Sequence, residues 1–472
     1  MVRWCILGKL KTIKMNKEYL ELINSKKHTE GNHGIDVNFL PENMFEYQKY
    51  VSEYAVKKGR CALFLDTGLG KTLIELTVAQ NFINKTKKPV LIITPLAVAF
   101  QFIKEAEKFG IKDIEYSKQG DYQSKIVVCN YERLDKFNSK DFDCVILDES
   151  SILKNFNGAI KDRVTNFLKK VKYRFLFTAT PSPNDCIELG TSAEALGYLG
   201  YMDMLSRFFA NNENNIRPQD IGTKFYLKPH ARDDFFKWVS SWSISMQKPS
   251  DLGFDDSMHI LPKLNVNFHS VKNTKNWVVN GQIMLFNQIA QRLGEVRDEQ
   301  KMTITERVEK AVELASKRET SVYWCNFNDE GHLIESLDKD SVQIHGSMDL
   351  DKKEDILLSF ANGQIKKLIT KPKITAFGLN WQHCNHTVYF PTFSYEQYYQ
   401  SIRRFYRFGQ TKDVDVDMVY SDGQKRVIDT LLLKTEKAKE LFKKLNHEVN
   451  QKFEIEKKLF DKEIIKPTFL TN

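Results

Sequence analysis

Short apolar runs alternate with longer segments of helical spacing along most of this chain. In the first half the runs fall at residues 61–65, 89–94, 126–129, 144–147 and 173–177. In the second half they fall at residues 322–325, 342–344, 367–370, 387–390 and 414–420. Apolar strands that alternate with helices are typical of parallel sheets covered on both faces. The pattern therefore predicts an α/β protein with two parallel sheets in tandem.

The same pattern predicts where the domains begin and end. The expected parts are an N-terminal extension at 1–40, a first sheet domain at 41–255, a linker with helices at 256–320, a second sheet domain at 321–420 and a helical tail at 421–472. We expect a helical insertion in the first domain at about 185–250, in which residues 231–246 are helical. The hinge between the domains is expected at 255–275, around Pro262.

The tail is rich in lysine and glutamate and has apolar residues at one helical spacing. These residues are Leu441, Leu445, Val449 and Phe453. They predict a helix packed on the second domain, and the mixed charges favour this over a basic arm for DNA.

Composition narrows the class of protein. The chain of 472 residues suits two or three domains, and its formal charge of +9 suits a polyanionic partner. No run of about 18 apolar residues is present, so no membrane span is expected. Residues 2–15 lack the apolar core of a signal peptide, and Met15 is a plausible start. The seven cysteines are widely spaced, which indicates a reducing compartment without a zinc framework.

One apolar run leads into a glycine-rich turn and then into a helix. This arrangement points backbone N–H groups at a phosphate, and Gly68 and Gly70 let the backbone come close to it. We expect a nucleoside triphosphate to bind here, on Thr67, Gly68, Leu69, Gly70, Lys71 and Thr72. Lys71 would reach the outer phosphates, and the Thr72 hydroxyl would hold Mg²⁺. The strict pattern has glycine or alanine where Leu65 stands, so the match is incomplete.

Two further features fit a nucleotide site. Asp148 and Glu149 end an apolar strand, where Asp148 can hold Mg²⁺ and Glu149 can orient and deprotonate a water molecule. An acidic pair at such a place is commonly just a helix cap. Tyr47 and Gln48 lie about twenty residues before the glycine turn, where an aromatic ring and an amide can bind adenine; a surface glutamine is the ordinary alternative.

The segment 400–410 carries a third group of candidate residues. Gln400, Arg404 and Arg407 recur at i, i+4 and i+7, which predicts that they share one face of a helix. Two guanidinium groups on one face suit a bidentate grip on phosphate, although a basic surface helix has the same pattern.

Taken in order, these motifs resemble those of superfamily 2 helicases. The motifs are Gly-Leu-Gly-Lys-Thr at 68–72, Thr-Pro-Leu at 94–96, Asp-Glu-Ser-Ser-Ile-Leu-Lys-Asn at 148–155 and Thr-Ala-Thr-Pro at 178–181. Lys-Asn at 154–155 and Arg-Phe-Gly-Gln at 407–410 are similar to the Swi/Snf-like branch. Residues 373–386 resemble helicases common in phage genomes. Ser150 and Ser151 depart from the pattern, because many relatives have Ala-His or Gly-His there.

The resemblance implies a fold and further site residues. It implies two RecA-like domains, with ATP and Mg²⁺ on the first and arginine fingers, Arg404 and Arg407, from the second. Gln400 and Gly378 would contribute to the ATP site. Nucleic acid would cross both domains along strand ends that carry Thr94, Pro95, Asn130, Tyr131, Asn326, His345, Gly346 and Thr375.

The function expected from this resemblance is an ATP-dependent DNA translocase or helicase. It would act on duplex or branched DNA with little sequence preference, and replication or recombination proteins are the partners considered. An RNA helicase of the same superfamily and a DNA-binding scaffold with a weak ATP site remain as alternatives. We expect a monomer in the cytoplasm, which would be that of the host cell if a phage encodes the chain.

Overall fold

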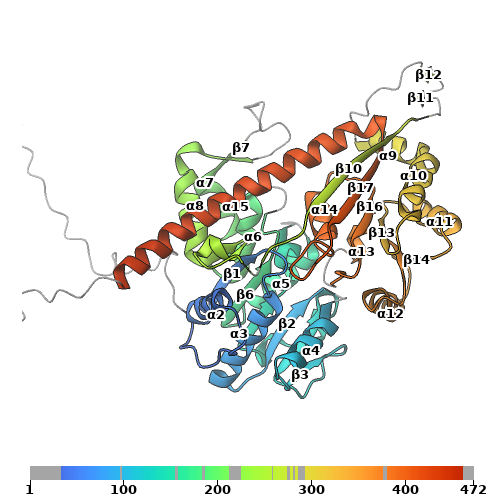
Figure 1. Cartoon of the computed structure of the whole chain (residues 1–472). Coiled ribbons are helices and arrows are strands. Elements are labelled where there is room, and N and C mark those ends of the chain that lie inside the picture. Colours follow the sequence, from blue (N-terminus) through green and yellow to red (C-terminus); the bar gives the residue numbers. More distant parts are fainter. Residues whose placement is uncertain are drawn as a thin grey trace, which may run out of the picture.

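The computed structural model shows two parallel-sheet domains, with a long C-terminal helix lying across both (Figure 1). It describes residues 33–95, 98–154, 158–182, 186–211, 225–257, 259–273, 277–279, 282–284, 293–375 and 380–460. Among these residues, no helix is long and apolar enough to cross a membrane.

The first sheet has seven parallel strands among the described residues, in the order β3-β4-β2-β5-β6-β1-β9. The strands are β1 (Arg60–Leu65), β2 (Val90–Thr94), β3 (Ile114–Tyr116), β4 (Ile126–Asn130), β5 (Cys144–Leu147), β6 (Tyr173–Thr178) and β9 (Ser243–Met246). The helices of this domain are α2 (Glu46–Lys58), α3 (Lys71–Thr86), α4 (Ala99–Lys108), α5 (Ala159–Leu168), α6 (Leu189–Leu196), α7 (Tyr201–Phe208) and α8 (Arg232–Trp242).

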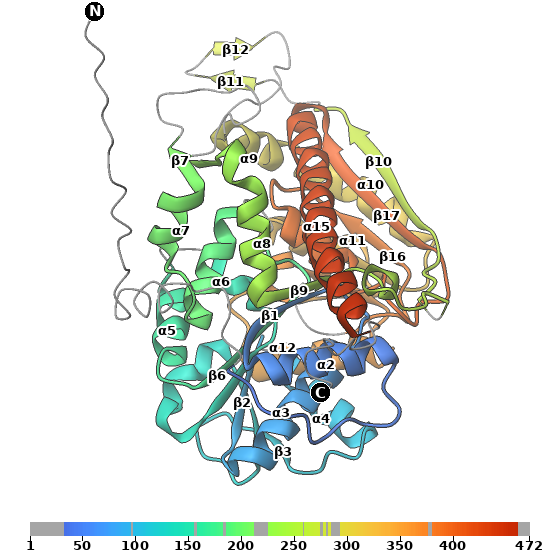
Figure 2. The same ribbon diagram turned by 90° about the vertical axis from the view of Figure 1, so that its left-hand side faces the viewer.

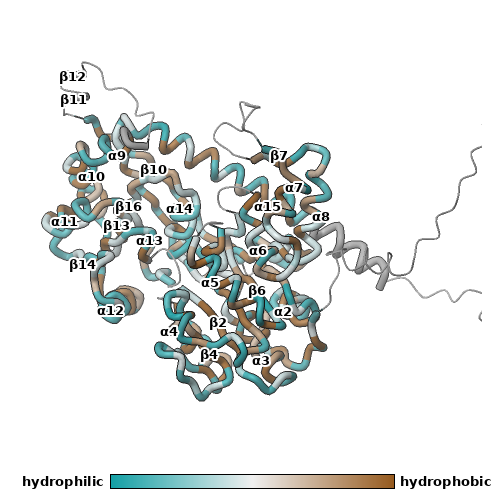
Figure 3. The backbone as a smooth tube through the Cα atoms, turned by 180° about the vertical axis from the view of Figure 1, so that it is seen from behind, coloured by the Kyte–Doolittle hydropathy of each residue, from teal (hydrophilic) through white to brown (hydrophobic). Residues whose placement is uncertain are grey.

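Alternating residues of each strand pack into two separate apolar layers. On β1, Ala62 and Phe64 belong to one layer, whereas Leu63 and Leu65 belong to the other. Figure 3 shows the apolar residues gathered on the strands and on α3. Burial on both faces explains why these strands are recognisable in the sequence as continuous apolar runs.

The second sheet is also parallel, with the described strands in the order β10-β17-β16-β13-β15-β14. They are β10 (Leu264–Val271), β13 (Ser321–Trp324), β14 (Ser341–Gln343), β15 (Lys367–Thr370), β16 (His386–Tyr389) and β17 (Val414–Ser421). Its helices are α9 (Leu293–Met302), α10 (Ile304–Ser316), α11 (Asn328–Leu337), α12 (Leu350–Ala361), α13 (Pro372–Thr375) and α14 (Tyr395–Ile402). The predicted fold class, two parallel-sheet domains in tandem, is confirmed.

Two segments differ from the sequence predictions. The helix expected at 231–246 ends at Trp242, and the next four residues form β9 beside β1. Residues 264–271 were assigned to the hinge region but form the edge strand β10. β10 lacks the apolar run by which the other strands were recognised, because its asparagines bind β17. Asn265 donates to Asp415 at 2.9 Å, and Asn267 donates to Asp417 at 3.0 Å.

The tail helix α15 (Lys425–Phe460) packs on both domains, not on the second alone. Ile428 and Leu431 are part of the second domain's core, whereas Leu441 and Leu445 are part of the first domain's core. Figures 1 and 2 show this helix crossing from one domain to the other. The predicted contacts of Val449 and Phe453 lie outside the described side chains.

A buried polar network ties β10, β16 and β17 together at the edge of the second sheet. Asp417 is 4% exposed, and its carboxylate lies 2.9 Å from the Nε2 atoms of both His386 and His269. Burial opposes ionisation of Asp417, but the hydrogen bonds from His386, His269 and Asn267 outweigh it and hold its pKa well below the usual range.

Asp417→Asn should therefore lower the free energy of unfolding at pH 7 by at least about 2 kcal/mol, since hydrogen bonds to a charged group are lost. A depressed pKa stabilises the fold fully above the unfolded-state pKa of the carboxyl, and this stabilisation is lost progressively as the pH falls from there toward the folded-state pKa. The difference from the wild type should thus begin to shrink below about pH 4 and shrink further at lower pH. Denaturant unfolding at about pH 7 and at about pH 2.5 measures both effects, with the exposed Asp429→Asn on α15 as the control. An equal difference at the two pH values would contradict this account.

Candidate active site

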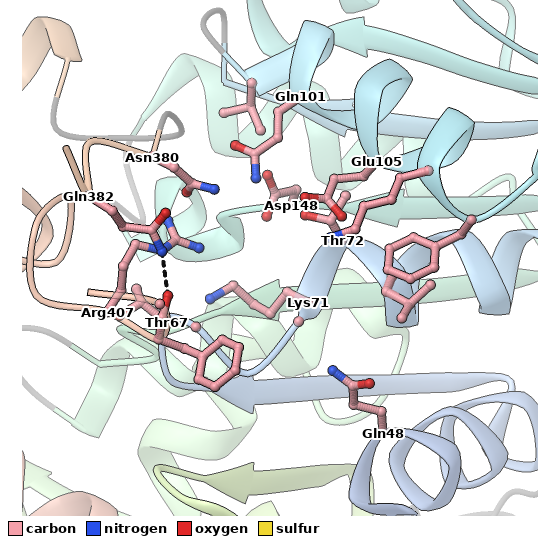
Figure 4. Close-up of a pocket in the computed structure, with 18 of the residues that line it drawn as sticks. Gln48, Thr67, Lys71, Thr72, Gln101, Glu105, Asp148, Asn380, Gln382 and Arg407 are labelled. Carbon is pink, nitrogen blue, oxygen red and sulfur yellow. Dashed lines mark hydrogen bonds between the residues drawn. The ribbon is translucent and has the colours of Figure 1, made fainter. Parts of the chain in front are cut away.

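A cavity of about 380 Å³ lies between the two domains. One wall comes from the first sheet, at the carboxyl ends of β1 and β5, and the other from residues 380–409 of the second domain. Figure 4 shows Lys71, Thr72 and Asp148 on one side, with Asn380, Gln382 and Arg407 across from them. Ligands of parallel sheets bind at such strand ends.

The glycine turn leads from β1 into α3 as predicted, and its shape requires glycine at two positions. Gly68 and Gly70 have φ angles of 86° and 77°. A Cβ on Gly70 would lie 2.2 Å from Nε2 of Gln48, and a Cβ on Gly68 would lie 2.8 Å from the backbone nitrogen of Phe408. The turn is therefore packed against α2 on one side and against the second domain on the other.

The predicted phosphate-binding residues occupy the cavity with one exception. Thr67, Gly68, Gly70, Lys71 and Thr72 line it, and the Lys71 ammonium donates to the Leu65 carbonyl at 3.1 Å. The Leu69 side chain is 2% exposed and lies in the apolar core, so this residue offers only its backbone.

The acidic pair lies at the end of β5, where the sequence predicts it. Asp148 and Glu149 are each 6% exposed and line the cavity. Glu149 has a φ of 52°, a left-handed conformation that costs energy in residues other than glycine and is frequent at functional sites. Burial, and then the charge of Glu149, raise the pKa of Asp148. This site therefore concentrates negative charge in a place poor in water.

A third carboxyl group, missed by the sequence reasoning, lies near this pair. Glu75 on α3 is 0% exposed, and neither of its oxygens has a hydrogen-bond partner among the described residues. Burial, and then the charge of Asp148, raise the pKa of Glu75 well above its usual value. Its position one turn after Lys71 and Thr72 was the available signal.

The arginine pair faces the acidic pair, but not from one helix. α14 ends at Ile402, so the prediction that Gln400, Arg404 and Arg407 share a helical face is wrong. A turn over residues 403–409 brings Arg404 and Arg407 to the cavity instead. Burial lowers the pKa of each to about 10. The Nε atom of Arg407 is buried and has no hydrogen-bond partner within the described part of the chain.

The other predicted nucleotide contacts have mixed outcomes. Gln48 lines the cavity, and its amide donates to the Leu69 carbonyl at 3.2 Å, which ties α2 to the glycine turn. Gln400 does not line the cavity, because its amide donates to the Thr180 hydroxyl at 3.2 Å across the two domains. Gly378 lies outside the described residues.

Three residues predicted to line the nucleic-acid path are buried instead, so that prediction is wrong for their side chains. Thr94 is 0% exposed and donates to Asp148 at 3.0 Å. Tyr131 is 1% exposed, and its hydroxyl donates to the Asp148 carbonyl at 2.7 Å. Asn130 is 0% exposed and accepts a hydrogen bond from Tyr116. These strand ends are central in the sheet, so they support the acidic loop rather than the surface.

The remaining residues predicted for nucleic acid lie nearer the surface. Pro95 and His345 are half-buried, and Gly346 is exposed. Asn326 lines a second cavity of about 380 Å³, together with Arg297, Lys371 and Lys373, at the carboxyl ends of β13 and β15. Thr375 ends α13, and its side chain lies outside the described side chains.

Several polar contacts join the two domains around the main cavity, and the sequence reasoning did not identify them. Lys154, after the acidic pair, forms an ion pair with Glu396 on α14. Arg403 donates to Asp66 at 2.8 Å, directly before the glycine turn. Gln101, Glu105, Asn380 and Gln382 also line the cavity. Only tertiary structure reveals these contacts, because isolated polar side chains carry no periodic signal.

Comparison with known proteins gives two family matches. The model described as type III restriction enzyme, res subunit, matches residues 41–183, and the model described as helicase conserved C-terminal domain matches residues 301–409.

Similar proteins share a limited part of the chain. The DNA annealing helicase and endonuclease ZRANB3 of Mus musculus is 27% identical over an alignment of 183 residues that covers 34% of this chain and 17% of the relative. The SWI/SNF-related matrix-associated actin-dependent regulator of chromatin subfamily A-like protein 1 of Xenopus tropicalis is 26% identical over an alignment of 168 residues that covers 33% of this chain and 18% of the relative. The chain thus spans 17–18% of the length of these relatives.

Among solved structures, the Sulfolobus solfataricus SWI2/SNF2 ATPase core in complex with dsDNA is 18% identical, with a TM-score of 0.40. The match covers 89% of this chain and 96% of that chain.

Proposed function

We propose that the chain belongs to the Swi/Snf-like branch of the superfamily 2 helicases and is a DNA-dependent ATPase that moves along duplex or branched DNA. The observation that supports this most is the composition of the main cavity. Lys71, Asp148 and Glu149 from the first domain face Arg404 and Arg407 from the second. A site divided in this way can hydrolyse a nucleotide only when the domains are closed, which couples hydrolysis to domain movement.

The residues of the first domain would bind the nucleotide and activate water. Backbone N–H groups of the glycine turn bind phosphate, and Lys71 moves from the Leu65 carbonyl to the outer phosphates. Glu149 accepts a proton from the attacking water and orients it. Tyr131 and Thr94 hold the Asp148 loop and its carboxylate in place.

The donor atoms at this site fit Mg²⁺. The Thr72 hydroxyl and the Asp148 carboxylate line the same cavity, and hard oxygen ligands of this kind suit Mg²⁺, which also binds substrate phosphates. When bound, Mg²⁺ supplies positive charge at the phosphate oxygens.

The second domain would complete the site. The buried Nε atom of Arg407 has no partner among the described residues, and Arg407 lines the cavity in which the outer phosphates would lie. Arg404 and Arg407 can therefore compensate the charge that develops as the terminal phosphate is transferred.

DNA would bind through its phosphates on the strand-end surface of the second domain. Arg297, Lys371 and Lys373 offer three cationic side chains around one cavity, with Asn326 as a polar neighbour. Phosphate contacts of this kind carry little sequence information and weaken with salt. The matched relative from mouse is named as a DNA annealing helicase, which supports DNA over RNA as the substrate.

We propose a monomer in the cytoplasm that works with replication or recombination proteins. The likeness of residues 373–386 to phage helicases implies that the cytoplasm is that of a host cell.

ATP hydrolysis should be stimulated by duplex or forked DNA more than by RNA, and the DNA affinity should fall steeply with salt. Measuring the hydrolysis rate with duplex, forked and single-stranded DNA and with RNA tests this. Displacement of the third strand from a triplex would report movement along the duplex. Stimulation by RNA alone would overturn the DNA assignment.

Lys71→Ala should abolish ATP hydrolysis, because the charge of the outer phosphates is then uncompensated. Steady-state hydrolysis measures this, and Lys85→Ala, an exposed lysine in the last turn of the same helix, is the matched control. Near-normal turnover of Lys71→Ala would mean that the glycine turn is not where ATP is hydrolysed.

Glu149→Gln should bind ATP normally and hydrolyse it very slowly, since the amide cannot accept the proton of the attacking water. The variant should remain ATP-bound and dissociate from DNA more slowly than the wild type. Nucleotide binding and DNA dissociation rates measure both effects. Loss of ATP binding would instead assign Glu149 a structural role.

Arg407→Ala should lower turnover far more than ATP affinity, because its guanidinium acts on charge that develops in the transition state. Such residues are typically worth about 10³–10⁵ in rate. Parallel measurements of turnover and nucleotide affinity separate the two effects, with the exposed Arg232→Ala on α8 as the control. Equal losses of affinity and turnover would indicate a folding defect.

A further inference from the structure

A buried ion pair joins the start of the glycine turn to the start of the arginine turn. Asp66, which directly precedes Thr67, is 5% exposed. Its Oδ2 accepts a hydrogen bond from Arg403 at 2.8 Å, and its Oδ1 accepts one from the Tyr399 hydroxyl. Arg403 and Tyr399 belong to the second domain, more than three hundred positions away in the sequence.

Arg403 is held from several sides. Its guanidinium lies over the rings of Tyr399 and Tyr406, with centroid distances of 5.0 and 5.4 Å. Its Nη1 also donates to the Tyr406 carbonyl at 3.3 Å, and 17% of its side chain is exposed. A guanidinium fixed by two rings, a carbonyl and a carboxylate has little freedom to move.

Each end of this ion pair also shapes the loop that carries the chemistry. Oδ1 of Asp66 accepts a hydrogen bond from the Thr67 backbone nitrogen at 2.6 Å, which fixes the entry to the glycine turn. Arg403 caps α14, and the chain turns there to present Arg404 and Arg407. Any shift between Asp66 and Arg403 therefore shifts the phosphate-binding loop relative to the two arginines.

We propose that Asp66 and Arg403 are positioning residues whose ion pair sets the distance between the glycine turn and the arginine pair. This inference rests on the proposed ATPase function and assigns a new role to residues outside the nucleotide cavity. Neither residue lines that cavity; both line a separate cavity of about 730 Å³.

The energetics favour a role in geometry over a role in stability. A buried ion pair gives little net stability, because removing two charges from water offsets their attraction, but it can favour one arrangement over others. A misplacement of about 1 Å can cost about 10²-fold in rate when reacting groups must be aligned. The pair is therefore expected to affect turnover more than binding.

The test compares Asp66→Asn, Arg403→Gln and the double variant with the wild type. Each single variant should lower the turnover number by about 10–100-fold, within the range for misaligned groups. The affinity for a fluorescent ADP analogue should change by less than threefold. The double variant should be no worse than the poorer single variant, because both substitutions remove the same contact.

Lys118→Gln is the matched control. Lys118 also pairs across the domains, with Asp351 at 2.8 Å and Glu354 at 3.6 Å, but it does not line the nucleotide cavity. Its loss should leave turnover within twofold of the wild type. A control as slow as Arg403→Gln would mean that domain contact in general, not this pair, controls the rate.

The remaining outcomes separate this inference from the proposed function. Additive losses in the double variant, or equal losses of turnover and affinity, would overturn the positioning role. A wild type that hydrolyses ATP without stimulation by DNA would overturn the proposed function, while the variants would still test the ion pair on basal turnover. A wild type without any hydrolysis would overturn both.

Discussion

The site depends on opposite charges held out of water on two facing walls. Asp148 and Glu149 are each 6% exposed on one domain, and Arg404 is 2% exposed on the other. Burying like charges together is costly unless opposite charge lies near. Each wall therefore compensates the other, and the arrangement requires that the carboxyl ends of β1 and β5 in the first sheet and the loops before β16 and β17 in the second domain line one shared cleft. A nucleotide that enters the cleft would therefore meet negatively and positively charged side chains that are already in place.

The strands around this cleft were predictable because burial on both faces makes each a continuous apolar run. The glycine turn and Asp148-Glu149 were predictable because they follow such runs directly. β10 was not predictable, since Asn265 and Asn267 satisfy their polarity by binding aspartates of β17, which are about 150 positions away. The sequence shows that these side chains are polar, but it does not show the aspartates that bind them and allow the segment to form a strand.

The predictions that were wrong at the site failed for a common physical reason. The spacing of the arginines predicted that they share one face of a helix. In the structure α14 ends at Ile402, and a turn brings both arginines to the cavity instead. Thr94 and Tyr131 were expected at the surface because they end strands, yet central strand ends are covered by the loops that follow them. The sequence shows that a residue lies at the end of a strand, but whether that residue is exposed depends on which loops pack over the strand ends.

The helix α15 has a mechanical consequence for any motion of the two domains. Ile428, in one core, and Phe442, in the other, are fourteen positions apart, which corresponds to about 21 Å of a continuous helix. Both domains thus pack on one continuous helix. Side chains on fixed faces of this helix enter both cores, so the domains cannot move relative to each other without bending the helix or withdrawing apolar side chains from one core. Opening of the cleft should therefore be limited by how far α15 can bend between the two sets of contacts.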